Sequence, residues 1–225
     1  MKQLPESQLR LAVILAALAG MIDVVAFLAL GGFFASFMSG NSTRLAIGIG
    51  GNWSDAMLAG GLILAFVAGV IGATVLARNA GPHRQVRIVA LVAALILMCA
   101  AIAKPYQAAQ ILLLAAAMGA MNGVFERDGE VSVGLTYMTG TLVRFGQGLA
   151  RWTMRDGDVG GWLRHAILWA SFLGGGLVGV GLYWRIGLST LYVAGVVAAA
   201  LTTWLWWEQR PRPALDPAAP PTPPE

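Results

Sequence analysis

Residues 37–41, Phe-Met-Ser-Gly-Asn, recur as Tyr-Met-Thr-Gly-Thr at residues 137–141. The same register continues at two further pairs, Arg44 with Arg144 and Gly48 with Gly148. One position off that register, residues 20–23, Gly-Met-Ile-Asp, match residues 119–122, Gly-Ala-Met-Asn. Self-similarity at a fixed period indicates a repeated structural unit. The sequence therefore predicts a chain built by tandem duplication.

The composition indicates that these units lie in a membrane. The chain is 57% hydrophobic and 12% charged, with a mean hydropathy of +0.70. Its apolar blocks are roughly 18 to 24 residues long, which is the length of a helix that crosses a bilayer. We expect six spans, near residues 9–31, 56–77, 86–103, 107–125, 162–184 and 187–207.

The repeat divides these spans equally. Residues 1–104 and 105–209 each hold three spans, and the Pro/Ala-rich residues 210–225 are expected to form a disordered cytoplasmic tail. Because an odd number of spans makes the second unit enter from the opposite side, the two halves should be inverted copies. The predicted fold is an all-α membrane protein with two inverted three-helix repeats.

Each repeat also has an interrupted segment, at residues 31–40 and 128–140, where glycines and β-branched residues favour extended backbone. Ser39 or Asn41 in the first half, and Thr139 or Thr141 in the second, are suitable N-caps for short helices that follow. Extended backbone at membrane depth must face protein or a water-filled cavity. Two alternatives stay open, namely extramembrane turns followed by interfacial helices, or segments that cross the membrane completely.

The basic residues predict the orientation. With six spans and a cytoplasmic start, all Lys and Arg residues except Arg44, Lys104 and Arg185 lie on the cytoplasmic side. This bias places both termini in the cytoplasm and the protein in the cell inner membrane. The net charge of +4 comes from residues spread over loops, so no nucleic-acid partner is predicted.

Asp23 lies within the first span, where a carboxylate costs roughly 2.5–3.5 kcal/mol on insertion scales. It either binds a solute or proton, or it pairs with Arg44, Arg144 or the interrupted backbone. Asn122 occupies the related place in the second half and cannot titrate. Any proton coupling would therefore belong to Asp23.

Arg44 and Arg144 lie one turn into the short helices, near their positive ends, and need a counter-anion. Asp23 or a bound solute would supply it. The acidic loop residues Glu126, Asp128 and Glu130 are either solvated or able to coordinate a cation. No catalytic motif, metal site or cofactor site is predicted, so the chain is not expected to be an enzyme. The candidate solute-binding residues are Asp23, Ser39, Gly40, Asn41, Arg44, Asn122, Thr139, Gly140, Thr141 and Arg144.

The motifs at residues 20–31 and 38–41, with those at 121–122 and 136–142, resemble the YoaK family of small bacterial inner-membrane proteins, a domain of unknown function. The resemblance covers nearly the whole chain and implies a protein with six spans. This sequence departs from the family pattern at Ser39, where threonine is usual, and at Met121, where glutamine is expected.

Together these features predict a secondary transporter or permease. A small polar or anionic solute would bind between the two interrupted segments and move on a proton or solute gradient. The alternative is a structural or accessory membrane protein that assembles through its glycine-rich helix faces and binds nothing small. The expected partners are the lipid bilayer, the solute and a second copy of the chain. Solute identity, coupling ion and transport direction are not fixed by the sequence.

Overall fold

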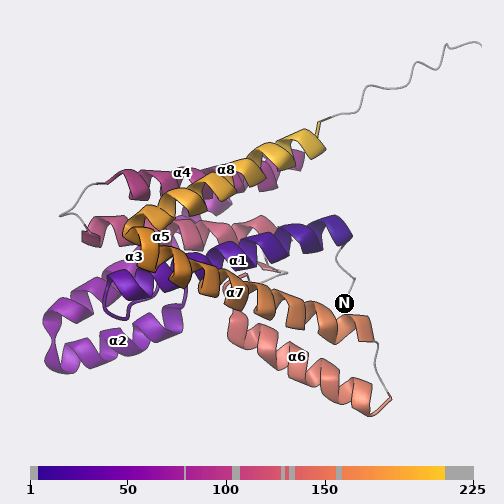
Figure 1. Cartoon of the computed structure of the whole chain (residues 1–225), viewed down its shortest axis with the longest axis horizontal. Coiled ribbons are helices and arrows are strands. Elements are labelled where there is room, and N and C mark those ends of the chain that lie inside the picture. Colours follow the sequence, from indigo (N-terminus) through magenta and orange to yellow (C-terminus); the bar gives the residue numbers. More distant parts are fainter. Residues whose placement is uncertain are drawn as a thin grey trace, which may run out of the picture.

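The computed structural model describes residues 5–78, 80–102, 107–127, 130–131, 135–155 and 159–210, and these residues are almost entirely helical (Figure 1). The predicted tail beyond residue 210 lies outside the described residues. The α-helices are α1 (Glu6–Ala29), α2 (Met38–Gly51), α3 (Trp53–Arg78), α4 (Arg84–Ala101), α5 (Gln107–Asn122), α6 (Met138–Thr153), α7 (Val159–Ile186) and α8 (Thr190–Glu208). Short 3-10 helices are η1 (Gly81–His83), η2 (Gly123–Phe125) and η3 (Gly187–Ser189).

The apolar blocks of the sequence form the long helices. Among the described residues, four helical stretches are long and apolar enough to cross a membrane: Glu6–Ala29, Trp53–Arg78, Gly81–Ala101 and Gly160–Glu208. The last of these contains α7 and α8. A fifth apolar stretch, Ala109–Phe125, is shorter. The helices thus lie where the sequence predicted apolar spans, while the number of crossings stays a prediction.

The helices pack in matched pairs. α1 packs along α7, and α3 packs along α5, so the first helix of each half contacts a long helix of the other half. The short helix α2 packs on α3, just as α6 packs on α7, and α4 packs on α8 (Figure 1). Exchange of α1–α4 with α5–α8 maps the α1–α7 contact onto α5–α3, maps α2–α3 onto α6–α7, and leaves the α4–α8 contact unchanged.

Glycines permit the two crossings between the halves. In both crossings a glycine of each helix lies directly on the backbone of the other helix, so that a Cβ atom at that glycine would collide with it. The contacts are Gly20 with Phe172 and Gly175 with Ala17 between α1 and α7, and Gly119 with Phe66 and Gly69 with Ala116 between α5 and α3. Small residues at helix interfaces let backbones approach closely, as expected in a membrane.

The first interrupted segment reverses the chain through two glycines. Gly31 and Gly32 have φ angles of 64° and 104°, a conformation that residues with a Cβ atom rarely adopt. Residues 33–37 then form bends and irregular backbone without a β-strand. Because the glycines complete the reversal early, α2 already begins at Met38.

The predicted N-caps are wrong in both halves. Phe37 and Tyr137 occupy the N-cap positions of α2 and α6, and neither helix has a side-chain cap. Ser39 and Thr139 lie inside the first turn instead. Asn41 is not available as a cap because its side chain bonds to Phe34.

The second interrupted segment starts as a small hairpin. Strand β1 (Glu126–Arg127) pairs antiparallel with β2 (Glu130–Val131), and Glu126 is the partner of Val131. This agrees with the extended backbone predicted there. Asp128, Gly129 and residues 132–134 lie outside the described residues.

Candidate functional site

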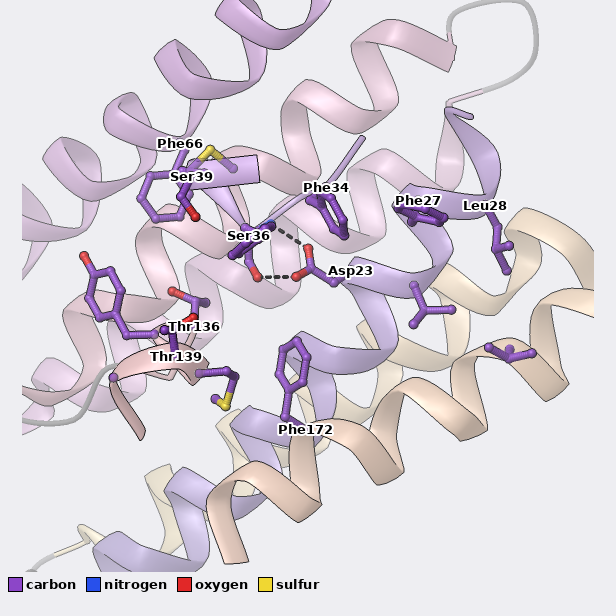
Figure 2. Close-up of a pocket in the computed structure, with 17 residues that line it drawn as sticks. Asp23, Phe27, Leu28, Phe34, Ser36, Ser39, Phe66, Thr136, Thr139 and Phe172 are labelled. Carbon is purple, nitrogen blue, oxygen red and sulfur yellow. Dashed lines mark hydrogen bonds between the residues drawn. The ribbon is translucent and has the colours of Figure 1, made fainter. Parts of the chain in front are cut away.

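A cavity of about 730 Å³ lies between the two halves (Figure 2). Its walls come from α1, α3 and α7, from the residues before α2 and α6, and from the first turns of these short helices. The lining residues are Asp23, Val24, Phe27, Leu28, Phe34, Ser36, Phe37, Met38, Ser39, Phe66, Thr136, Tyr137, Met138, Thr139, Gly140, Phe172 and Val180. The cavity is large enough for a drug-sized ligand, because such sites range over about 300–1,000 Å³.

Asp23 is the charged group of this cavity. Only 6% of the residue is exposed, and Ser36 binds both carboxylate oxygens. The Ser36 backbone N–H donates to Oδ1 at 2.6 Å, and the Ser36 hydroxyl donates to Oδ2 at 2.6 Å (Figure 2). Hydrogen bonds of this kind compensate a buried carboxylate. Of the options open from sequence, the described contacts show Asp23 bonded to the interrupted backbone and to no arginine.

The second half has an equivalent but neutral pair. The Thr136 hydroxyl donates to Asn122 Oδ1 at 3.0 Å, and the Asn122 amide donates to the carbonyl of Met118 at 2.9 Å. Thr136 stands in the repeat where Ser36 stands in the first half. Each half therefore ties its first helix to its interrupted segment by one polar pair, and only the first pair carries charge.

Aromatic side chains form much of the remaining wall. The rings of Phe27 and Phe34 lie 5.0 Å apart between centroids, and those of Phe34 and Phe37 lie 5.1 Å apart, edge to face. Phe66 and Phe172 line the cavity from α3 and α7. Their backbones are the ones that Gly119 and Gly20 contact, so the two rings are supplied by equivalent helix crossings.

The N-terminal turns of α2 and α6 both reach this cavity, through Ser39, Thr139 and Gly140. The first N–H groups of a helix have no acceptor within the helix, and that end is equivalent to about half a positive charge. The two short helices thus contribute to the wall of one cavity.

Four of the ten candidate residues line the cavity: Asp23, Ser39, Thr139 and Gly140. The other six are absent from its described lining: Gly40, Asn41, Arg44, Asn122, Thr141 and Arg144. Three of these, Asn41, Asn122 and Thr141, bond to nearby backbone groups. Asn41 is fully buried and bonds to both the N–H and the carbonyl of Phe34, at 3.1 and 2.7 Å. Thr141 donates only to the carbonyl of Tyr137 in its own helix.

Arg44 and Arg144 have neighbours other than Asp23, one of the two counter-anions expected from the sequence. The Arg44 guanidinium lies 4.5 Å from the centre of the Phe33 ring, and its end packs against Gly32. Arg144 lies near His165 of α7. Glu126, one of the acidic loop residues, forms an ion pair with Arg84 at 2.7 Å, and Arg84 also donates to the carbonyl of Gly123. These contacts are made by residues outside the cavity lining.

The aromatic wall and the partners of Asp23 and Asn122 were not predicted from the sequence. A signal was present, since Ser36 and Thr136 occupy equivalent places in the repeat, and so do Phe37 and Tyr137. Phe66 and Phe172 have no polar group that would suggest a binding role from the sequence. Their contribution depends on how α3 and α7 cross the other half.

Comparison with known proteins gives a family. A family model described as "Protein of unknown function (DUF1275)" matches residues 11–204. The chain is also 32% identical over 186 residues to the UPF0700 transmembrane protein RA0705 of Rhizobium meliloti (strain 1021), which covers 82% of this chain and 80% of that relative. No solved structure matches the chain. The prediction of a transmembrane protein from a family of unknown function is confirmed, whereas the name YoaK stays a prediction.

Proposed function

We propose an activity from the cavity, since the chain belongs to the DUF1275 family and the function of that family is unknown. The chain is a secondary transporter or permease. It binds a small solute between its two interrupted segments, with a polar group of the solute near Asp23 and the rest against the aromatic wall.

One observation carries this proposal: equivalent segments of the two halves line a single cavity. The residues before α2 and α6 both contribute, as do the first turns of these helices, and the buried carboxylate of Asp23 lies among them. Secondary transporters bind substrates at the interface of two repeats, on interrupted helices. Ionisable residues within membrane segments mark substrate or ion pathways.

The matched helix contacts support an inverted repeat. The pairing of α1 with α7 and of α5 with α3 is what two units exchanged by a pseudo-two-fold axis require. If α1, α3 and α4 each cross the membrane, the second unit starts on the opposite side. We therefore propose six spans in two units, residues 1–104 and 105–209, with each short helix re-entrant. The placement of basic residues supports an inner-membrane location with cytoplasmic termini.

The structural alternative needs glycine faces that are free to pack against other chains. Gly20, Gly69, Gly119 and Gly175 are used in contacts within this chain, whereas Gly72, Gly174 and Gly181 are open. A homodimer through other surfaces stays a prediction. That the chain is not an enzyme also stays a prediction.

The proposal is tested by solute-dependent thermal stabilisation of the purified protein in detergent, followed by uptake into proteoliposomes. A solute that binds only the folded state raises the apparent melting temperature. We expect one solute class to give a shift and to be transported. Asp23→Asn should abolish both the stabilisation and the uptake, although the amide oxygen still accepts the hydrogen bond from the Ser36 N–H.

Asp55→Asn is the matched control, because Asp55 is an acidic residue in the first turn of α3 and does not line the cavity. It should bind and transport as the unchanged protein does. Stabilisation without uptake would show a binding protein and not a transporter. If no solute class stabilises the folded protein, and Asp23→Asn is equally stable, the structural alternative replaces the proposal.

A further inference from the structure

We propose that the solute is an organic cation. Its ammonium group lies beside Asp23 and against ring faces, and its other end carries a hydrogen-bond acceptor. This inference rests on the proposed function, whose cavity it uses, and it replaces the small polar or anionic solute expected from the sequence with a cationic one.

The charge of the lining is the first reason. Among the described lining residues, Asp23 is the only aspartate, and neither lysine nor arginine is present. Ser36 makes one hydrogen bond to each oxygen of Asp23. A carboxylate offers about four lone-pair sites, so acceptors remain for an ammonium group. An anion would instead face this carboxylate without Arg44 or Arg144 beside it.

The rings are the second reason. A cation is attracted to the face of an aromatic ring, and aromatic cages recognise quaternary ammonium groups in this way. Phe34 and Phe172 lie on different sides of Asp23, and Phe27 continues the wall beyond Phe34 (Figure 2). The same interrupted segment already holds one cation by this interaction, since Arg44 lies 4.5 Å from the Phe33 ring centre.

The helix ends define the other end of the solute. Ser39 and Thr139 lie on the opposite side of Asp23 from Phe27 and Leu28 (Figure 2). The Met38 N–H donates to the Ser36 carbonyl, but the next N–H groups of α2 and those of the first turn of α6 have no acceptor within their helices and favour one such as a hydroxyl or carbonyl oxygen. Their partial positive charges partly balance the charge of Asp23. They also keep the cationic group at the Phe27 side.

The experiment compares three probes of nearly equal shape. Choline is the cation, 3,3-dimethylbutan-1-ol is its neutral isostere, and 3,3-dimethylbutanoate is an anion of the same branched form. Dissociation constants are measured on the full chain in detergent by calorimetry and by thermal shift. We expect choline to bind about tenfold or more tightly than the alcohol, the ratio given by a desolvated cation–ring contact. The carboxylate should bind most weakly.

Two variants and a control assign this preference to the cavity. Asp23→Asn keeps the side-chain shape and should reduce the preference for choline over the alcohol to about threefold or less. Phe27→Leu removes one ring from the wall on the side of the ammonium group, and it should weaken choline binding but not alcohol binding. Tyr192→Leu is the control, because Tyr192 is a similarly exposed aromatic residue on α8 that does not line the cavity. It should bind all three probes as the unchanged protein does.

The outcomes separate the two proposals. Equal binding of choline and the alcohol, or tightest binding of the carboxylate, would overturn the cationic solute while it supported a binding cavity. A choline preference that survives in Asp23→Asn would also overturn it. Binding of none of the three probes would overturn the cation inference, and the broader solute panel would then decide the proposed function separately.

Discussion

At the residue scale, Asn41 is the side chain that fixes the cavity wall. Its amide bonds the N–H and the carbonyl of Phe34, and it is fully buried. We expect Asn41→Ala to destabilise the protein by about 2–4 kcal/mol, because two backbone groups lose their partner. Equilibrium unfolding in mixed micelles measures this loss.

Thr141 is the matched control for Asn41, since it holds the same position in the second half. Its hydroxyl bonds only the carbonyl of Tyr137, four residues earlier. Such a bond within a helix adds little stability. Thr141→Ala should therefore change the unfolding free energy by less than about 0.5 kcal/mol. Equal effects at Asn41 and Thr141 would show that the Phe34 bonds do not hold the wall.

The polar pairs of the two halves give a second prediction. Ser36→Ala removes the hydroxyl that donates to Asp23, whereas Thr136→Val removes the one that donates to Asn122. A hydrogen bond to a charged group contributes about 1.5–3 kcal/mol, against about 0.5–1.5 kcal/mol for a neutral one. We expect the serine substitution to destabilise more in the same unfolding experiment. In the Asp23→Asn background this difference should shrink, and an unchanged difference would contradict a charge-assisted bond.

These residues also show how much of the site could be predicted. Asp23 and Asn122 stand out in the sequence because polar groups inside apolar helices are costly. Their partners could not be chosen, because Ser36 meets Asp23 only after Gly31 and Gly32 have reversed the chain. Polarity identified the charged centre of the site, and the chain reversal determined its contacts.

At the element scale, the helices were more predictable than their ends. Apolar runs fix the position of α1, α3, α4, α5, α7 and α8, since burial in a bilayer or a core needs continuous apolar length. The start of α2 depends on which of two roles Asn41 takes, an N-cap or a partner of Phe34. Asn41 prefers an N-cap position in general, but its bonds to Phe34 draw it into the helix and leave Phe37 as the cap residue.

The glycine crossings give a prediction at this scale. A Cβ atom at Gly69 would collide with the backbone of Ala116 in α5, whereas no atom lies within 4 Å of the corresponding point at Gly72 in the same helix. We expect Gly69→Ala to destabilise by about 1–3 kcal/mol, because it forces α3 away from α5. Gly72→Ala should be neutral or stabilising by up to about 1 kcal/mol.

The same comparison exists at the other crossing, between α7 and α1. A Cβ atom at Gly175 would collide with the backbone of Ala17, whereas no atom lies within 4 Å of the corresponding point at the neighbouring Gly174. In thermal unfolding, Gly69→Ala and Gly175→Ala should therefore both lower the stability, whereas Gly72→Ala and Gly174→Ala should not. A loss of stability at only one crossing would argue that the two helix pairs are not equivalent.

At the scale of the whole molecule, the duplication links sequence, packing and cavity. Matching motifs predicted two units, and the structure pairs α1 with α7 and α5 with α3. The aromatic wall could not be foreseen, because it is assembled from helices of both units at their crossing. The location of the cavity between the units followed from the repeat. Its ring content, and the absence of Arg44 and Arg144 from its described lining, depended on the three-dimensional packing.

The inverted arrangement itself makes the last prediction. Asn52 and Met154 follow α2 and α6 at equivalent places, and both are exposed. If the halves are inverted, single cysteines at these two positions face opposite sides of the membrane. In a Cys99→Ala background, an impermeant maleimide added to spheroplasts should label Asn52→Cys. It should reach Met154→Cys only in inside-out vesicles, and there it should also reach the N-terminal control Ser7→Cys. Labelling of the first two positions from one side would mean that the short helices cross completely or that the halves are parallel, and the solute pathway would then require a different geometry.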